Sequence, residues 1–229
     1  MNSSTCVDCG PGEFQNETGT SECKVCEAGE YAGHYRMSRC DICESGSHAS
    51  TNGSSRCTDC VAGQYAGGDG HTECIDCAPG RYSSFGDASE CNICGAGYYS
   101  LANSTECTSC DAGWFQNESI ASKCFQCDPG YITDTTGESV CAPCGVGEYA
   151  EVEGQSECQL CAAGKYQNES ATSSCVYCGS GYYSRGDGES ICVVCGLGRY
   201  SERMMNSSTC VDCGPGEFQN ETGTSECKV

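Results

Sequence analysis

The chain has 229 residues, with 32 Asp and Glu against 11 Lys and Arg and a formal net charge of −21. Leu, Ile, Val and Phe make up only about a ninth of the residues, and such a composition by itself is typical of a disordered chain. The 27 cysteines reverse that expectation, because a disulfide loop of about 14 residues contributes roughly 3 kcal/mol in the chain-entropy model. The acidic excess would repel phosphate and excludes nucleic acid as a partner.

The chain is built from copies of one 17-residue pattern, first seen in residues 9–26. Each copy begins with a leading cysteine, and the period slips by one residue only twice. A fixed period of this kind predicts a repeat array. We number the copies 1 to 13 by their leading cysteines, which are Cys9, Cys26, Cys43, Cys60, Cys77, Cys94, Cys110, Cys127, Cys144, Cys161, Cys178, Cys195 and Cys213.

Each copy predicts a small β-hairpin. Three residues after the leading cysteine comes a glycine in every copy, here called the turn glycine; in copy 1, Gly12 follows Pro11, and Pro-Gly is typical of a type II turn. Two residues later an aromatic residue occurs in eleven of thirteen copies, with His48 and Ile132 as the exceptions. We expect this aromatic residue to cover a disulfide and fill a miniature core. A polar reversal, such as residues 67–70, and a second arm ending in a closing cysteine complete the hairpin.

The predicted fold class is small, disulfide-rich β. Glycine and cysteine interrupt the chain every few residues, and no window of ten or more carries a helical apolar period, so almost no helix is expected. A single hairpin has too little apolar surface to stand alone. We therefore expect disulfide-stapled hairpins that stack on their neighbours in sequence into an elongated rod or solenoid.

A longer repeat lies above the 17-residue period. Residues 1–25 recur without a change as residues 205–229. We interpret residues 1–204 as one higher-order repeat of twelve copies and residues 205–229 as the start of the next, so the chain is expected to be a window of a longer array. This window contains no membrane segment.

Cysteine spacing favours local disulfides without settling the pairing. If each leading cysteine pairs with the closing cysteine of its own copy, thirteen bridges use 26 cysteines and leave only Cys6. Pairing across neighbouring copies would need a 34-residue alternation, which the sequence lacks. The predicted disulfide cysteines are the thirteen leading cysteines together with Cys23, Cys40, Cys57, Cys74, Cys91, Cys107, Cys124, Cys141, Cys158, Cys175, Cys192, Cys210 and Cys227.

Eight of the nine asparagines lie in N-glycosylation sequons, Asn-x-Ser/Thr, and only Asn92 does not. N-glycosylation and disulfide formation need the same oxidising compartment, so the sequence predicts an extracellular or cell-surface protein that passes through the secretory pathway. The sequons fall at two positions of the repeat. The predicted glycosylation sites at the first position are Asn16, Asn117, Asn168 and Asn220, and those at the second are Asn2, Asn52, Asn103 and Asn206.

The pattern resembles a known one. Cys-x-x-Gly-x-Tyr closed by a cysteine fourteen residues after the first, as in residues 77–91, resembles the first module of tumour-necrosis-factor-receptor cysteine-rich domains and the ephrin-receptor-like (GCC2/GCC3) repeats of large surface proteins. The resemblance implies local disulfides and a non-catalytic extracellular module. Receptor domains alternate this module with a second one, which is not found here. Uniform arrays of this type also resemble cell-surface and flagellar-hair proteins of protists and algae.

Catalytic and metal sites find little support in the sequence. Paired CxxC motifs have the spacing of zinc sites and of redox enzymes, but glycosylation sequons and the lack of basic clusters argue against both interpretations. His34, His48 and His71 are scattered, so no catalytic triad is expected. Glutamates before several closing cysteines suit calcium, yet no 12-residue calcium loop is present. We predict no enzyme, no metal site and no cofactor apart from N-linked glycans.

Two functions remain. The verbatim recurrence after 204 residues favours a structural glycoprotein that assembles with copies of itself into a fibril or a cell-surface or flagellar appendage. The alternative is a receptor-like ectodomain that binds an extracellular protein or mediates adhesion, to which the tripeptide Arg185-Gly186-Asp187 would be suited.

Overall fold

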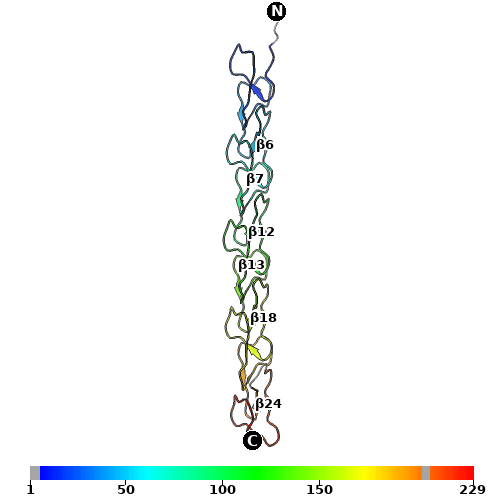
Figure 1. The fold of residues 1–229 in the computed structure, drawn as a ribbon, viewed down its shortest axis with the longest axis vertical. Helices are drawn as coiled ribbons and strands as arrows, with labels where there is room; N and C mark the ends of the chain where they lie inside the picture. Colours follow the sequence, from blue (N-terminus) through cyan, green and yellow to red (C-terminus); the bar gives the residue numbers. More distant parts are fainter. Residues whose placement is uncertain (1–5, 203–206) are drawn as a thin grey trace, which may run out of the picture. The chain divides into compact units, whose positions relative to one another are not determined.

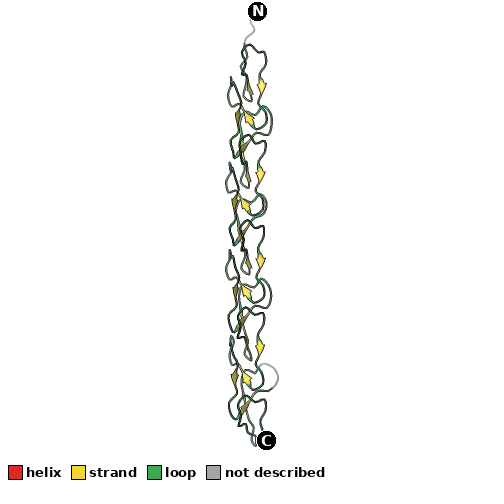
Figure 2. Cartoon of the chain, turned by 90° about the vertical axis from the view of Figure 1, so that its left-hand side faces the viewer, coloured by secondary structure: helices red, strands yellow, loops and turns green. Residues whose placement is uncertain are grey.

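The structure is a computed structural model that describes residues 6–202 and 207–229. The chain divides into two compact units: unit 1 comprises residues 1–108 and 118–123, and unit 2 comprises residues 109–117 and 124–229. In each unit the hairpins follow one another in chain order (Figure 1). Short strands alternate with longer loops and turns, and the described residues contain no helix (Figure 2). The expected small disulfide-rich β fold is therefore confirmed.

Each of the first twelve hairpins pairs two strands of two residues, one from each arm of the same copy, and copy 13 has a single bridge between Phe218 and Lys228. The registers are antiparallel, as in Glu13 opposite Val25. The pairs are β1 (Glu13–Phe14) with β2 (Lys24–Val25), β3 (Glu30–Tyr31) with β4 (Asp41–Ile42), β5 (Ser47–His48) with β6 (Thr58–Asp59), β7 (Gln64–Tyr65) with β8 (Ile75–Asp76), β9 (Arg81–Tyr82) with β10 (Asn92–Ile93), β11 (Tyr98–Tyr99) with β12 (Thr108–Ser109), β13 (Trp114–Phe115) with β14 (Phe125–Gln126), β15 (Tyr131–Ile132) with β16 (Ala142–Pro143), β17 (Glu148–Tyr149) with β18 (Gln159–Leu160), β19 (Lys165–Tyr166) with β20 (Val176–Tyr177), β21 (Tyr182–Tyr183) with β22 (Val193–Val194), and β23 (Arg199–Tyr200) with β24 (Val211–Asp212).

The predicted turn after each leading cysteine is present. In copy 1 the Glu13 amide donates to the Gly10 carbonyl at 3.0 Å, which closes a four-residue turn with Pro11 and Gly12 at its centre. Gly12 has a φ of 86°, the left-handed value that a type II turn needs at its third position and that glycine adopts without cost. The turn glycines of all thirteen copies share this conformation, with φ between 72° and 90°.

The buried centre of each copy is smaller than the sequence suggested. The aromatic residues that were expected to fill a miniature core are only partly buried, and Phe218 is 52% exposed. In copies 1–12 the leading cysteine is buried instead, and from copy 2 onward so is the residue six positions after it, here called the arm residue. The arm residues from copy 2 onward that are at most 6% exposed are Ala32, Ala49, Ala66, Ser83, Ser100, Gln116, Thr133, Ala150, Gln167, Ser184, Ser201 and Gln219.

A ladder of backbone hydrogen bonds explains this burial. The Gly12 amide of copy 1 donates to the carbonyl of the arm residue Ala32 in copy 2, at 2.8 Å, and the Cys26 amide donates back to the Gly12 carbonyl at 3.0 Å. The amide of Ala32 in turn donates to the Ser54 carbonyl of copy 3 at 3.1 Å. An arm residue thus lies between the backbones of two neighbouring copies, where a small side chain fits and a large aromatic side chain does not.

Candidate functional site

The disulfides close each hairpin at its base. The thirteen bridges of the described residues join the leading and closing cysteines of the same copy, which are the pairs that the spacing favoured. The two slips of the period appear as separations of 13 residues for Cys94–Cys107 and 15 for Cys195–Cys210. Cys6 is the free cysteine of the described residues, and it is exposed.

The far end of each hairpin reaches back along the array. A residue in the left-handed conformation, here called the tip residue, lies ten positions after the leading cysteine, or nine in the shorter copy 6, with φ between 58° and 80°. Its amide bonds the preceding copy, as Gly53 does to the Cys26 carbonyl at 2.8 Å. The tip residues are Gly19, Arg36, Gly53, Gly70, Asp87, Asn103, Ile120, Gly137, Gly154, Ala171, Gly188 and Gly223.

Nine of these tip residues also pack against the turn glycine two copies earlier. A Cβ added to Gly12 would lie 2.1 Å from the Gly53 carbonyl oxygen, and one added to Gly147 would lie 2.0 Å from the Gly188 oxygen. The expectation that copies touch only their neighbours in sequence was therefore incomplete, because each copy also contacts the next but one. This contact recurs within both compact units and is the most regular feature of the surface that the copies share.

A side-chain contact supports the backbone ladder in three copies. The residue nine positions after the leading cysteine accepts a hydrogen bond from a turn of the preceding copy through its Oδ1 atom. Asn52 accepts from the Ala28 amide at 2.9 Å, Asp69 from the Ser45 amide at 3.1 Å, and Asp187 from the Ala163 amide at 3.0 Å. Asparagine and aspartate are therefore equivalent here, because only an oxygen acceptor is needed.

This contact also involves the tripeptide Arg185-Gly186-Asp187. The Asp187 carboxylate is bound to the preceding copy, and the next residue, Gly188, is a tip residue that packs on Gly147. The carboxylate therefore has a role within the array, and the structure adds nothing to the adhesion hypothesis for this tripeptide.

The predicted sequon asparagines within the described residues are all exposed: Asn16, Asn52, Asn103, Asn117, Asn168 and Asn220. The other two, Asn2 and Asn206, lie outside the described residues. The two repeat positions differ in their surroundings. The first lies on the outer arm of the hairpin, and the second lies at the tip, where the copies meet.

One group of potential metal ligands occurs in the described residues. The Nδ1 or Nε2 atom of His48 and the sulfur atoms of Cys60 and Cys74 lie within 4.8 Å of one another. The two cysteines form a disulfide, however, and a metal binds the thiolate form of cysteine. His48, which replaces the usual aromatic residue, instead packs with its Nδ1 3.2 Å from the Cys74 sulfur.

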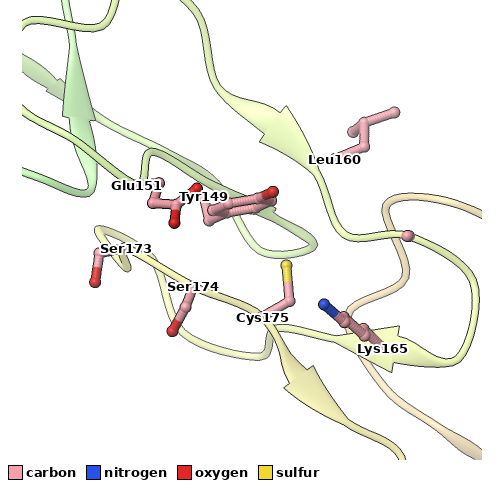
Figure 3. A pocket seen from close by; sticks show the side chains of 8 residues that line it. Tyr149, Glu151, Leu160, Lys165, Ser173, Ser174 and Cys175 are labelled. Atoms are coloured by element: carbon pink, nitrogen blue, oxygen red, sulfur yellow. The ribbon is translucent and has the colours of Figure 1, made fainter. Parts of the chain in front are cut away.

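A surface depression of about 200 Å³ lies in unit 2. Figure 3 shows Tyr149, Glu151 and Lys165 around it, with the sulfur of Cys175 facing the Lys165 ammonium. Cys175 is bonded to Cys161, so its sulfur cannot act as a nucleophile. Lys165 lies 4.6 Å from the centre of the Tyr177 ring, a cation–π contact that stabilises the hairpin locally.

The ion pair between Arg36 and Asp8 lies at the surface. The hydrogen bond and the charge of Asp8 raise the pKa of Arg36, whose Nε lies 2.9 Å from the carboxylate. Arginine is charged at any physiological pH regardless, and both side chains are exposed, so water screens the pair. The chain as a whole carries a strong net negative charge of −21.

The geometry can be compared with known proteins. A family model described as "Tyrosine-protein kinase ephrin type A/B receptor-like" matches residues 97–140 and again residues 130–174. Residues 97–174 are ephrin-receptor-like repeats. The same leading cysteine, turn glycine and local disulfide continue through the other copies. No curated protein matches the chain.

Ephrin-receptor-like repeats are a non-catalytic extracellular module. Together with thirteen successive disulfides they indicate an extracellular or secreted protein, because such bonds persist in oxidising compartments. Among the described residues, no helix is both long and apolar enough to cross a membrane.

Proposed function

We propose that this protein is a structural extracellular glycoprotein that reaches the cell surface through the secretory pathway and builds a fibril or a cell-surface or flagellar appendage. The observation that carries the proposal is the repeated contact between a turn glycine and the tip residue two copies later. Because the turn glycine and the tip residue recur with the 17-residue period, each added copy would find the same surface on the copies before it, and the array would gain length rather than thickness.

Two further features support a mechanical rather than a recognition role. The identity of residues 1–25 and 205–229 suits a polymer, which needs the same surface at regular intervals. A local disulfide in each copy would carry a pulling force past the loop that it encloses, so that only the short segments between bridges could be extended. N-linked glycans would cover the outer arms and hinder proteases.

Assembly would involve copies of the same chain. The net charge of −21 keeps unassembled chains apart, so divalent cations are a natural assembly aid, and other extracellular proteins are secondary partners. An extended array remains our expectation, supported by contacts within each unit that run to the next copy and the next but one.

Electron microscopy of the native material tests the proposal. We expect long fibres with a regular axial repeat. If divalent cations assist assembly, a chelator should thin or disperse these fibres. Discrete monomers or receptor-sized particles would instead support the alternative, a receptor-like ectodomain with a protein ligand.

A further inference from the structure

The two sequon positions have different contacts, and this difference decides which asparagines carry sugar. The inference rests on the proposed glycoprotein and specifies its sites. Four sequons share the sequence Gln-Asn-Glu-Ser/Thr, with Asn16, Asn117, Asn168 and Asn220 as acceptors. Asn52 and Asn103 lie at the tip position, where the copies meet.

A glutamine holds the first type of sequon outward. Gln167 is 6% exposed; its Oε1 accepts from the Glu169 amide at 3.0 Å, and its Nε2 donates to the Ser174 carbonyl at 2.8 Å. The side chain thus ties the two arms of the loop together on both sides of Asn168. Gln15 and Gln219 make the equivalent pairs of bonds around their own sequons. We call this arrangement the glutamine clamp.

The clamped asparagines project toward flexible neighbours. Oδ1 of Asn16 accepts from the Lys24 ammonium at 2.9 Å, and Oδ1 of Asn220 accepts from the Lys228 ammonium at 3.0 Å. Lysine carries its charge on a flexible four-carbon chain, and both lysines are exposed. Either can move aside for a sugar without disturbing the backbone.

At the tip position the partners are backbone. Oδ1 of Asn52 accepts from the Ala28 amide of the preceding copy. Asn103 is itself a tip residue with a φ of 58°, and its Oδ1 lies 2.3 Å from the position that a Cβ on Gly63, two copies earlier, would take. Neither neighbour can move without opening the ladder between copies.

The geometry of the sugar linkage turns this difference into a selection rule. A glycosylated asparagine amide is planar and trans, like a peptide bond, so the sugar carbon on Nδ2 lies on the same side as Oδ1. The first sugar therefore sits next to the partner of Oδ1. At Asn16 and Asn220 that partner is a mobile ammonium, whereas at Asn52 and Asn103 it is the backbone of another copy.

We propose that the secreted, folded protein carries N-glycans at the clamped sequons Asn16, Asn168 and Asn220 and at Asn117, which has the same Gln-Asn-Glu sequence. Asn52 and Asn103 are unmodified in that protein, because a sugar there would meet the backbone of another copy. Asp69 and Asp187 cannot be glycosylated, yet their carboxylates accept the same hydrogen bond as Asn52 does. The side chain at this position therefore serves the contact between copies.

Site mapping of the full secreted chain tests this. Enzymatic release of N-glycans in ¹⁸O-labelled water converts each glycosylated asparagine to labelled aspartate, which peptide mass spectrometry locates. Label is expected at the three clamped sites and at Asn117, with unlabelled asparagine at Asn52 and Asn103. Label at Asn52 or Asn103 in most molecules overturns the inference and leaves the glycoprotein intact. Absence of sugar from all six sites overturns both.

Sequons introduced at new sites test whether the position within the repeat decides which asparagines carry a glycan. The pair Asp69→Asn with His71→Thr creates a sequon at the tip position of copy 4, and the pair Glu151→Asn with Glu153→Thr creates one at the outer position of copy 9, where both glutamates are exposed. The secreted copy 9 variant is expected to gain the mass of one glycan, and the secreted copy 4 variant none. Equal gain in both variants would refute the selection rule.

Discussion

Replacing a single turn glycine tests whether the contact between alternate copies stabilises the array. In Gly147→Ala the new methyl group meets two obstacles. The residue has a φ of 82°, and the Cβ position lies 2.0 Å from the Gly188 carbonyl oxygen. Gly198→Ala is the matched control within the 229-residue chain, where only one copy follows copy 12 and no tip residue two copies later approaches the Cβ position. Its φ is 72°, and its amide bonds the next copy in the same way, at 2.8 Å to the Gln219 carbonyl.

The two variants share one cost and differ in the other. A left-handed alanine costs about 1–2 kcal/mol relative to a right-handed one, and this applies to both. In Gly147→Ala the tip must also retreat by about 1 Å, because real Cβ contacts are not found below 3.0 Å. That movement opens the bond from the Gly188 amide to the Cys161 carbonyl, now 2.7 Å long. The loss of this bond and the crowding together add about 2 kcal/mol.

Hydrogen exchange of the native protein, followed by mass spectrometry, measures this local cost. An added 2 kcal/mol corresponds to exchange at the Gly188 amide about 30-fold faster than in the unaltered chain. Gly198→Ala should leave the Gly188 amide unchanged while lowering the melting temperature slightly. If Gly147→Ala leaves exchange at Gly188 unchanged, the contact between alternate copies does not stabilise the array.

Three further predictions follow from the same contacts. Asn52→Ala should speed exchange of the Ala28 amide about fivefold through loss of one hydrogen bond, whereas Asn52→Asp, which keeps the acceptor, should not. Ala66→Leu should destabilise the protein by about 1–3 kcal/mol in thermal unfolding because Ala66 is fully buried, while Tyr65→Leu, at the partly buried aromatic position, should cost less; the reverse order would contradict the burial pattern. Iodoacetamide without reductant should leave the 26 bridged cysteines unmodified, and labelling of any of them on peptide mapping would disprove the local disulfides.

The turn glycines show what a sequence pattern can predict and what it cannot. Their position after Pro11 and its equivalents was enough to predict a turn with a positive φ. The pattern gave no sign that a second backbone approaches Gly147 and its equivalents, since the approaching residue lies some 40 residues away and is glycine in some copies and Ile120 or Ala171 in others. Turn chemistry is local, whereas a close approach depends on how the copies stack.

At the aromatic position the sequence pattern predicted burial that the structure does not have. Its regular occurrence suggested a core residue, yet the buried residue is the one that follows it, which varies among Ala, Ser, Thr and Gln. A small or polar side chain gives no hydrophobic signal, and its burial arises from backbone hydrogen bonds to the copies before and after it. The only available clue was that large apolar residues are rare at this position.

The sequence by itself determined the period, the hairpin, the turn, the local spacing of the disulfides and the compartment, because each depends on residues within one copy or on composition. Tertiary structure decided what lies between copies: the ladder of backbone bonds, the left-handed tips such as Arg36 and Asn103, and the different surroundings of the two kinds of sequon. The physical reason is that these contacts join backbone atoms, which every residue has, so no side-chain pattern marks them in advance.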